Sequence, residues 1–134
     1  MAITNIKESF TNDLETVWQI VTSLEHYTWR NDLSKIEVIE PHKKFIEYTK
    51  KGYQTTFTIT TFKPYQRYEF DIENDNIKGH WTGLFSSQNS ITFIDFTEDI
   101  KAKKIFMRPF IRFYLKKQQT TYINDLKKAL NSNE

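Results

Sequence analysis

Residues 68–73 read Tyr-Glu-Phe-Asp-Ile-Glu, which is the most regular alternation of apolar and acidic side chains in the chain. In an extended strand, successive side chains point to opposite faces, so Tyr68, Phe70 and Ile72 share one face and the three acids share the other. Such a strand is typical of an antiparallel sheet with one face in water and one face covered by other elements.

Turn-forming residues flank this strand at regular intervals. They recur about every 10–12 residues, which is the spacing that an antiparallel meander produces. The runs between them are rich in Thr, Tyr, Phe and Ile, so we expect six strands between Ile36 and Ile100, after a first strand over residues 3–10. The turns fall at residues 41–42, 51–52, 63–64, 74–76 and 86–89.

Helical periodicity appears on both sides of the strand region. Asn12 followed by Glu15 has the form of a capping box, and an apolar face follows at helical spacing, so we expect a short helix there. A second short helix is expected over residues 24–32. A long helix is expected to begin between residues 105 and 109, with Pro109 in its first turn, and to end near Leu130. Its apolar stripe is Met107, Ile111, Leu115, Gln118, Tyr122, Leu126 and Ala129.

Length and composition exclude several kinds of site. The 134 residues fit a single domain over residues 1–134. The chain has no Cys for a thiol nucleophile, and three Gly are too few for a glycine-rich phosphate loop. His26, His42 and His80 lack metal-ligand spacing, so we expect neither a metal nor a cofactor. The start of the chain resembles no secretion signal and no apolar run is long enough to span a membrane, which predicts a cytoplasmic protein.

The order of elements, together with several short motifs, resembles the START-related helix-grip superfamily, which includes polyketide cyclase/dehydrase-like, lipid-transport and birch-pollen-allergen proteins. The resemblance covers nearly the whole chain and implies an α+β fold. A curved seven-stranded antiparallel sheet would wrap around the long C-terminal helix, with two short helices after the first strand. The motifs are Val17-Trp18, Trp29, Gly79-His80-Trp81, Thr92-x-Ile94-x-Phe96-x-Glu98 and Tyr122-x-x-x-Leu126-Lys127.

The resemblance also implies a cavity between sheet and helix that holds a hydrophobic or aromatic small molecule. The aromatic content of 16% is high, which agrees with an aromatic-lined cavity or a thick aromatic core. Gly83 lies between Trp81 and Phe85 on the same strand and either leaves space in a cavity floor or marks a bulge. The expected ligand-binding residues are Trp29, Phe57, Tyr68, Phe70, Trp81, Phe85, Phe96, Glu98, Phe110 and Tyr114.

Glu98 is the candidate polar group of that cavity. Strand parity with Ile94, Phe96 and Ile100 places its carboxyl group on the covered face. Burial without a partner would raise its pKa and suit it to acid–base chemistry or to ligand binding, whereas a pairing with a Lys or Arg at the rim would lower the pKa.

Charge is distributed unevenly along the chain. Residues 1–100 carry a net charge of −5, residues 101–134 carry +7, and residues 101–117 contain seven basic residues and no acid. Aromatic Phe106, Phe110 and Phe113 are interleaved with basic residues, and Arg108, Arg112 and Lys116 form a row at i, i+4 spacing. The segment is either the wide apolar face and solvated flank of a packed helix, or a surface for an anionic partner.

Three functions remain open at this point. The first is binding of a hydrophobic small molecule, lipid or polyketide-like, in the cavity. The second is a cyclase/dehydrase-type enzyme that uses Glu98 or His80 as its acid–base group. The third is docking to a protein or a membrane through residues 101–117. Nucleic-acid binding is disfavoured, because the exposed sheet face around residues 69–73 is acidic and would repel phosphate.

Overall fold

The computed structural model describes residues 2–131, which form seven strands and two α-helices. Apart from one short helix, the strands and helices follow the expected order along the chain, so the α+β class is confirmed. The elements are β1 (Ala2–Phe10), α1 (Leu14–Thr22), β2 (Leu33–Glu40), β3 (Lys44–Thr49), β4 (Gln54–Lys63), β5 (Arg67–Glu73), β6 (Ile77–Gln88), β7 (Ile91–Ala102), a 3₁₀ turn η1 (Ile105–Met107) and α2 (Ile111–Asn131).

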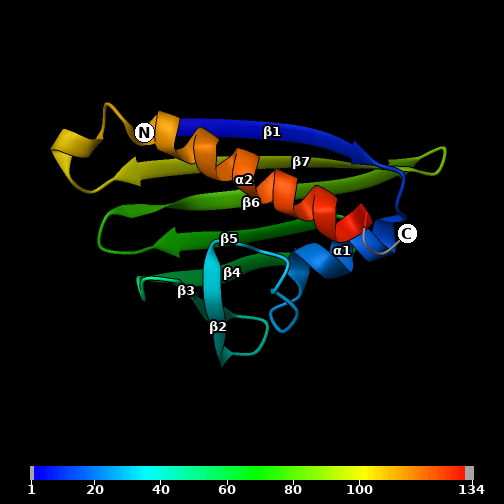
Figure 1. The fold of residues 1–134 in the computed structure, drawn as a ribbon, viewed down its shortest axis with the longest axis horizontal. Coiled ribbons are helices and arrows are strands. Elements are labelled where there is room, and N and C mark those ends of the chain that lie inside the picture. Colours follow the sequence, from blue (N-terminus) through cyan, green and yellow to red (C-terminus); the bar gives the residue numbers. More distant parts are fainter. Residues whose placement is uncertain (1, 132–134) are drawn as a thin grey trace.

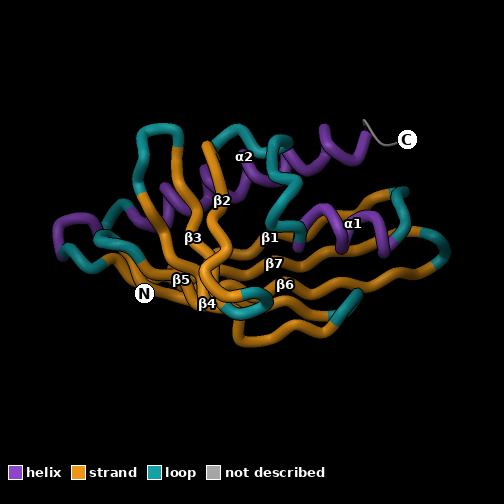
Figure 2. Tube along the Cα trace, turned by 90° about the horizontal axis from the view of Figure 1, so that it is seen from below, coloured by secondary structure: helices purple, strands orange, loops and turns teal. Residues whose placement is uncertain are grey.

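All seven strands form one antiparallel sheet in the order β1-β7-β6-β5-β4-β3-β2. Strands that follow each other in the chain are neighbours from β2 to β7, and β1 closes the far edge beside β7. Helix α2 crosses one face of the sheet diagonally (Figure 1). Seen along the sheet, β2 and β3 bend toward the layer that holds α2 (Figure 2). The expected curved sheet around a long C-terminal helix is therefore confirmed.

The alternation in β5 has the expected consequence. Tyr68 and Ile72 are buried on the inner face, and Phe70 between them is half-buried, whereas Asp71 and Glu73 are exposed. Across β6, Phe70 pairs with Trp81, so the two rings lie side by side on the inner face. The inner face of the sheet therefore supplies the core, and the opposite face lies in water.

Helix α1 begins one residue later than its expected cap. The side chain of Asp13 accepts a hydrogen bond of 2.7 Å from the backbone N–H of Thr16, so Asp13 is the N-cap in place of Asn12. The amide of Asn12 instead donates to the carbonyl oxygen of Leu130, which ties the start of α1 to the end of α2. Trp18 in α1 is buried among the rings of the core.

The second short helix expected over residues 24–32 is wrong, because these residues form turns and bends. Side chains replace helical bonds here: the hydroxyl of Ser23 accepts from the backbone N–H of His26, and the carboxylate of Asp125 accepts from the backbone N–H of Asn31. Hydrogen bonds of this kind compete with helix formation. The carboxylate comes from α2, far along the chain, so local periodicity cannot reveal it.

Helix α2 begins at Ile111, later than the expected start between residues 105 and 109. The backbone N–H of Met107 donates to Lys104 and that of Phe110 donates to Met107, so short i→i+3 turns precede the helix and Pro109 lies outside it. The expected stripe is one residue out of phase at Gln118, which is exposed, while Gln119 is buried. The buried apolar side chains are Ile111, Leu115, Ile123, Leu126 and Leu130.

Strand β2 forms an irregular outer edge of the sheet. Its pairing with β3 shifts register between Leu33 and Lys35 and again between Val38 and Glu40. Leu33 is the one residue of β2 that is fully buried. The edge is thus held less tightly than the central strands, which pair on both sides.

Candidate functional site

The inner face of the sheet gathers six of the expected ligand-binding aromatic residues into one cluster. The rings of Phe70 and Trp81 stack nearly parallel, with centroids 4.8 Å apart, and Trp81 contacts Phe96 at 4.8 Å. Tyr68 meets both Phe70 and Trp81 edge to face. The six residues are Phe57, Tyr68, Phe70, Trp81, Phe85 and Phe96. Sequence parity therefore placed this group correctly on one face.

Gly83 makes room for a side chain of its own strand. A Cβ atom at Gly83 would collide with the six-membered ring of Trp81, and Phe96 lies close to the same position. The indole thus lies flat over the glycine, two residues along β6. The space that Gly83 leaves is occupied by Trp81, and the Phe70–Trp81 stack depends on it.

Glu98 is on the inner face, directly opposite Trp81 in the pairing of β6 with β7. Its side chain is half-buried, and burial raises the pKa of its carboxyl group to about 7. Among residues 2–131, no Lys, Arg or hydrogen-bond donor pairs with it. Glu98 therefore does not pair with a Lys or Arg at the rim, which was one of the two arrangements that the sequence allowed.

The connection between α1 and β2 covers one side of the aromatic cluster. Trp29 meets Tyr122 of α2 edge to face at 5.4 Å, and Tyr122 in turn contacts Phe96 at 6.2 Å. Arg30 lies over the ring of Tyr122 at 5.2 Å and forms an ion pair of 2.8 Å with Glu47 of β3. Trp29 is thus linked to the cluster through α2.

Sequence reasoning missed Arg30, Glu47 and Asp125 as site residues. Alternation along β3 could have found Glu47, because it shares a face with buried Phe45. Asp125 could not be found in this way, since its partner Asn31 is distant in the chain. Its carboxylate accepts from both the backbone and the side chain of Asn31, at 3.0 and 2.7 Å. This contact fixes the connection that carries Trp29 and Arg30.

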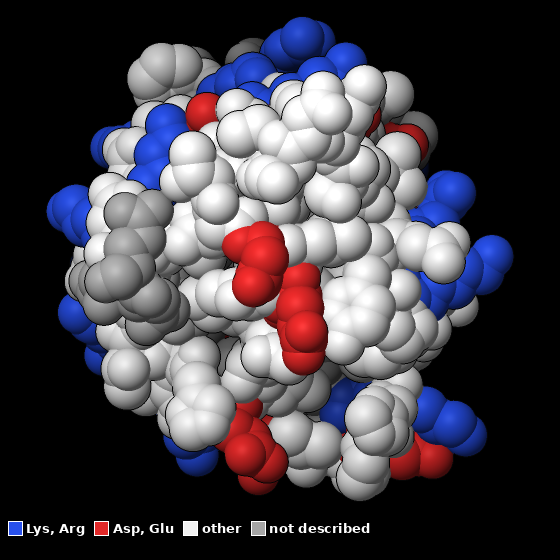
Figure 3. All heavy atoms as spheres, turned by 90° about the vertical axis from the view of Figure 1, so that its right-hand side faces the viewer, with Lys and Arg blue, Asp and Glu red and all other residues white. Residues whose placement is uncertain are grey.

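A hollow of about 850 Å³ opens beside this connection, between α1, the β4–β5 turn and the last turns of α2. Trp29 is the one expected ligand-binding residue that lines it. Figure 3 views the molecule from the end at which α1 lies, where Asp and Glu side chains lie near the middle and Lys and Arg side chains toward the rim. The walls of the hollow include Trp18, Ile20, Trp29, Tyr65, His26 and Gln19.

A second hollow, of about 360 Å³, lies where the end of β7 meets the start of α2. Lys101, Arg108 and Arg112 contribute its charged side chains, and Ile100 and Ile111 its apolar ones. The six rings of the cluster and Glu98 line neither hollow; the rings pack against one another instead.

Phe110 and Tyr114 do not join the cluster. Both side chains are exposed: Phe110 directly precedes α2, and Tyr114 lies on the side of the helix that faces away from the sheet. The expectation that they bind a ligand beside the cluster does not match this placement. The buried face is instead aliphatic, with Leu115 and Leu126 at its centre.

His80 lies on the outer face of the sheet, away from the cluster. Its Nδ1 is 2.7 Å from Asp71 and its Nε2 is 2.7 Å from Glu69. Burial alone would lower the pKa of His80, but hydrogen bonds and charge interactions with these two carboxylates raise it, and the same contact lowers the pKa of Glu69 to about 2. His80 is thus held by two carboxylates on the outer face, and the structure does not bring it together with the aromatic cluster.

Within residues 2–131, no helix is long and apolar enough to cross a membrane. The same residues contain no cluster of three His, Asp or Glu side chains that could hold a metal ion.

Comparison with solved structures finds close matches in fold. A START superfamily protein from Mycobacterium smegmatis matches with a TM-score of 0.89 at 10% identity, covering all of both chains. A conserved protein from Geobacillus kaustophilus matches with a TM-score of 0.82 at 12% identity, covering 97% of this chain and 95% of that one.

DynU16, a protein of the dynemicin biosynthetic locus, matches with a TM-score of 0.80 at 10% identity over all of this chain and 49% of its own. No protein-family model matches the chain, and no curated protein matches its sequence. The agreement in architecture, over the whole length of the first of these structures, establishes that the chain has the helix-grip fold of START superfamily proteins.

Proposed function

We propose that this protein binds a hydrophobic or aromatic small molecule, lipid-like or polyketide-like, between the inner face of the sheet and α2. The proposed site consists of the aromatic cluster, Glu98 and Trp29. Phe110 and Tyr114 are left out of it, because both are exposed. The fold shared with START superfamily proteins is consistent with this kind of function.

The observation that carries the proposal is the unpaired carboxyl group of Glu98 on an otherwise aromatic face. A polar group that is largely removed from water and lacks a protein partner costs free energy. A ligand that offers it a hydroxyl or amine group recovers part of that cost. An apolar pocket with few, well-placed polar groups is the usual form of a small-molecule site.

Trp29 connects this site to the larger hollow. Its ring lines the hollow and also contacts Tyr122, which lies against Phe96. The volume of about 850 Å³ is within the usual range for small-molecule sites. We therefore propose that a ligand enters through the hollow and that its ring displaces some of the ring–ring contacts of the cluster.

Native mass spectrometry of the freshly purified protein tests the proposal, since a bound ligand adds a defined mass that denaturation removes. A fluorescent apolar probe gives a second measurement: it should bind the wild type and lose at least about tenfold in affinity in Trp81→Ala, Trp29→Ala or both. Phe93→Ala, on the outer face, is the matched control and should bind like the wild type. Equal probe affinity in all four proteins contradicts the site.

A cyclase/dehydrase-type reaction is the second candidate, and the pKa of Glu98 favours it. A carboxyl group with a pKa of about 7 can both give and take a proton at neutral pH. If the co-purified ligand is converted by the wild type, Glu98→Gln should bind it but convert it at least about 100-fold more slowly. Unchanged conversion in Glu98→Gln removes Glu98 from the chemistry while leaving the binding proposal intact.

A further inference from the structure

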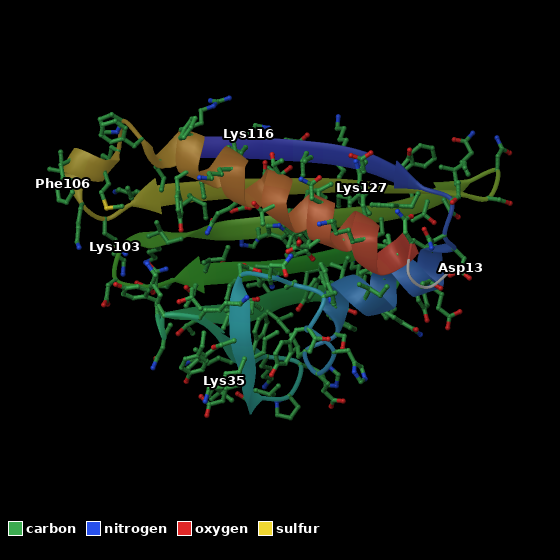
Figure 4. All side chains as sticks on the ribbon, viewed as in Figure 1. Asp13, Lys35, Lys103, Phe106, Lys116 and Lys127 are labelled. Atoms are coloured by element: carbon green, nitrogen blue, oxygen red, sulfur yellow. The ribbon has the colours of Figure 1, made fainter. Side chains whose placement is uncertain are left out.

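Four large apolar side chains project into water at the end of the molecule where α2 begins. Ile105, Phe106, Phe110 and Phe113 expose between 70% and 79% of their surface. Ile105 and Phe106 belong to η1, Phe110 directly precedes α2, and Phe113 lies in its first turn. Figure 4 places the labelled Phe106 at the outermost end of η1, directed away from the sheet. Single exposed apolar residues are common, but a contiguous group of four large ones marks an interaction surface.

Packing against the sheet does not account for these side chains. In an α-helix of 3.6 residues per turn, Phe110, Phe113 and Lys117 lie on the side opposite to Ile111 and Leu115. Ile111 and Leu115 are buried against the sheet, so the aromatic side points away from it. The wide apolar face of a packed helix, which the sequence allowed, therefore does not explain Phe110 and Phe113.

Positive charge surrounds the exposed rings without carboxylates to balance it. Lys103 pairs with Glu73 at 2.8 Å. Within residues 2–131, however, no carboxylate pairs with Lys104, Arg108, Arg112 or Lys117. Cations near a helix N-terminus oppose the helix dipole, so their presence there does not stabilise the fold.

The smaller hollow lies at the same end of the molecule, on the side of α2 that bears Ile111, and it adds positive charge there. Lys101, Arg108 and Arg112 line it, and no acidic side chain does. Arginine side chains form forked hydrogen bonds with phosphate groups. The hollow thus has the chemistry of a site for the phosphate of a lipid headgroup, at the end of the molecule that carries the exposed rings.

We propose that residues 104–117 dock this protein on an anionic membrane surface. Ile105, Phe106, Phe110 and Phe113 enter the boundary between headgroups and acyl chains, and Lys104, Arg108, Arg112 and Lys117 contact lipid phosphates. Basic, aromatic-bearing helical segments bind membranes in this way. A second copy of the chain fits less well, because it would bring two unbalanced basic surfaces together.

Vesicle co-sedimentation tests the proposal with the full chain. The probes are phosphatidylcholine vesicles with and without about 30% phosphatidylglycerol, at about 0.05 M and 0.5 M salt. The wild type should bind the anionic vesicles at low salt, and its affinity should fall at least about tenfold in high salt or without phosphatidylglycerol. Two triple variants, Phe106→Ser/Phe110→Ser/Phe113→Ser and Lys104→Gln/Arg108→Gln/Arg112→Gln, should each lose at least about tenfold in affinity.

Matched controls change the same chemistry elsewhere. Lys50→Gln/Lys51→Gln/Lys63→Gln removes three exposed charges, two from a turn and one from the end of β4, and Tyr53→Ser/Phe93→Ser removes two exposed rings. Both controls should bind vesicles like the wild type and unfold at the wild-type temperature.

Several results would overturn the proposal. One is the absence of binding to anionic vesicles; another is binding that the two triple variants and the two controls lose equally. Titration with inorganic phosphate shows whether the site binds the phosphate of a lipid headgroup or a free phosphate ion. Saturable binding of phosphate without binding to vesicles contradicts membrane docking. Self-association of the wild type that the aromatic variant abolishes, again without vesicle binding, assigns the surface to a second copy instead.

Discussion

At the scale of single residues, the raised pKa of the Glu98 carboxyl group makes the stability of the protein depend on pH. Its folded pKa of about 7 exceeds the ordinary value of 4.5, so the folded state binds the proton more tightly than the unfolded state does. Folding is thus favoured while Glu98 is protonated. The contribution is complete below pH 4.5 and is lost progressively as the pH rises through about 7.

Glu98→Gln removes this titration. Near pH 8.5 the free energy of unfolding of the variant should exceed that of the wild type by about 1–3 kcal/mol. Near pH 4.5 the two proteins should have the same free energy of unfolding. Urea unfolding at both pH values measures the difference. Glu25→Gln, at an exposed position, should match the wild type throughout. A Glu98→Gln variant that is less stable than the wild type at pH 8.5 would mean that the carboxylate has a cationic partner.

Gly83 carries the second prediction at this scale. A methyl group there meets the ring of Trp81, so Gly83→Ala should lower the free energy of unfolding by about 1–3 kcal/mol and change the near-ultraviolet circular dichroism of the tryptophans. The neighbouring Leu84→Ala, on the outer face, should stay within about 0.5 kcal/mol of the wild type. Equal stability of both variants would show that the indole has room to move.

At the scale of elements, one contact between α2 and the α1–β2 connection holds Trp29 in place. Asp125→Ala leaves the backbone N–H and side-chain amide of Asn31 without their acceptor. We expect a loss of about 1–3 kcal/mol in stability and faster amide hydrogen exchange over residues 24–32. Asn124→Ala, at the exposed neighbouring position in α2, is the control. Unchanged exchange in Asp125→Ala would place the anchor elsewhere.

The elements differ in how far the sequence predicts them. Alternation in β5 and the stripe along α2 report burial directly, so Tyr68, Ile72, Leu115 and Leu126 were assigned correctly. The helix predicted over residues 24–32 is wrong, because Asn31 bonds to Asp125 of α2 and His26 bonds to the side chain of Ser23. Contacts between distant parts of the chain leave no periodic signal.

The candidate site follows the same division. Strand parity predicts that Trp81, Phe96 and Glu98 share one face, as the pairing of β6 with β7 confirms. Parity cannot tell how the rings use the space between the layers, and Trp81 fills the room beside Gly83. The sequence pattern also does not distinguish a buried from an exposed aromatic residue near the start of a helix. The prediction that Phe110 binds a ligand in the cavity has this cause.

At the scale of the whole molecule, local stability against opening should decrease across the sheet from β7 to β2. Strand β7 lies between β1 and β6 and buries five side chains, whereas β2 pairs on one side only and buries one. We therefore expect the amides of residues 33–40 to exchange with deuterium at least about tenfold faster than those of residues 91–102. Mass spectrometry of the digested protein measures both in one experiment. Equal protection would require that the sheet open as one unit.

The irregular edge formed by β2 bears on whether copies of this protein can join through their sheets. An exposed sheet edge is a template on which further strands can add, and a flat, continuous edge invites ribbons and fibrils. The two register shifts in β2 interrupt the ladder, and Lys35 and Glu37 place charge along it. A strand from another molecule would find no long run of evenly spaced donors and acceptors there. The loose pairing at this edge thus protects the folded protein against fibrillar aggregation.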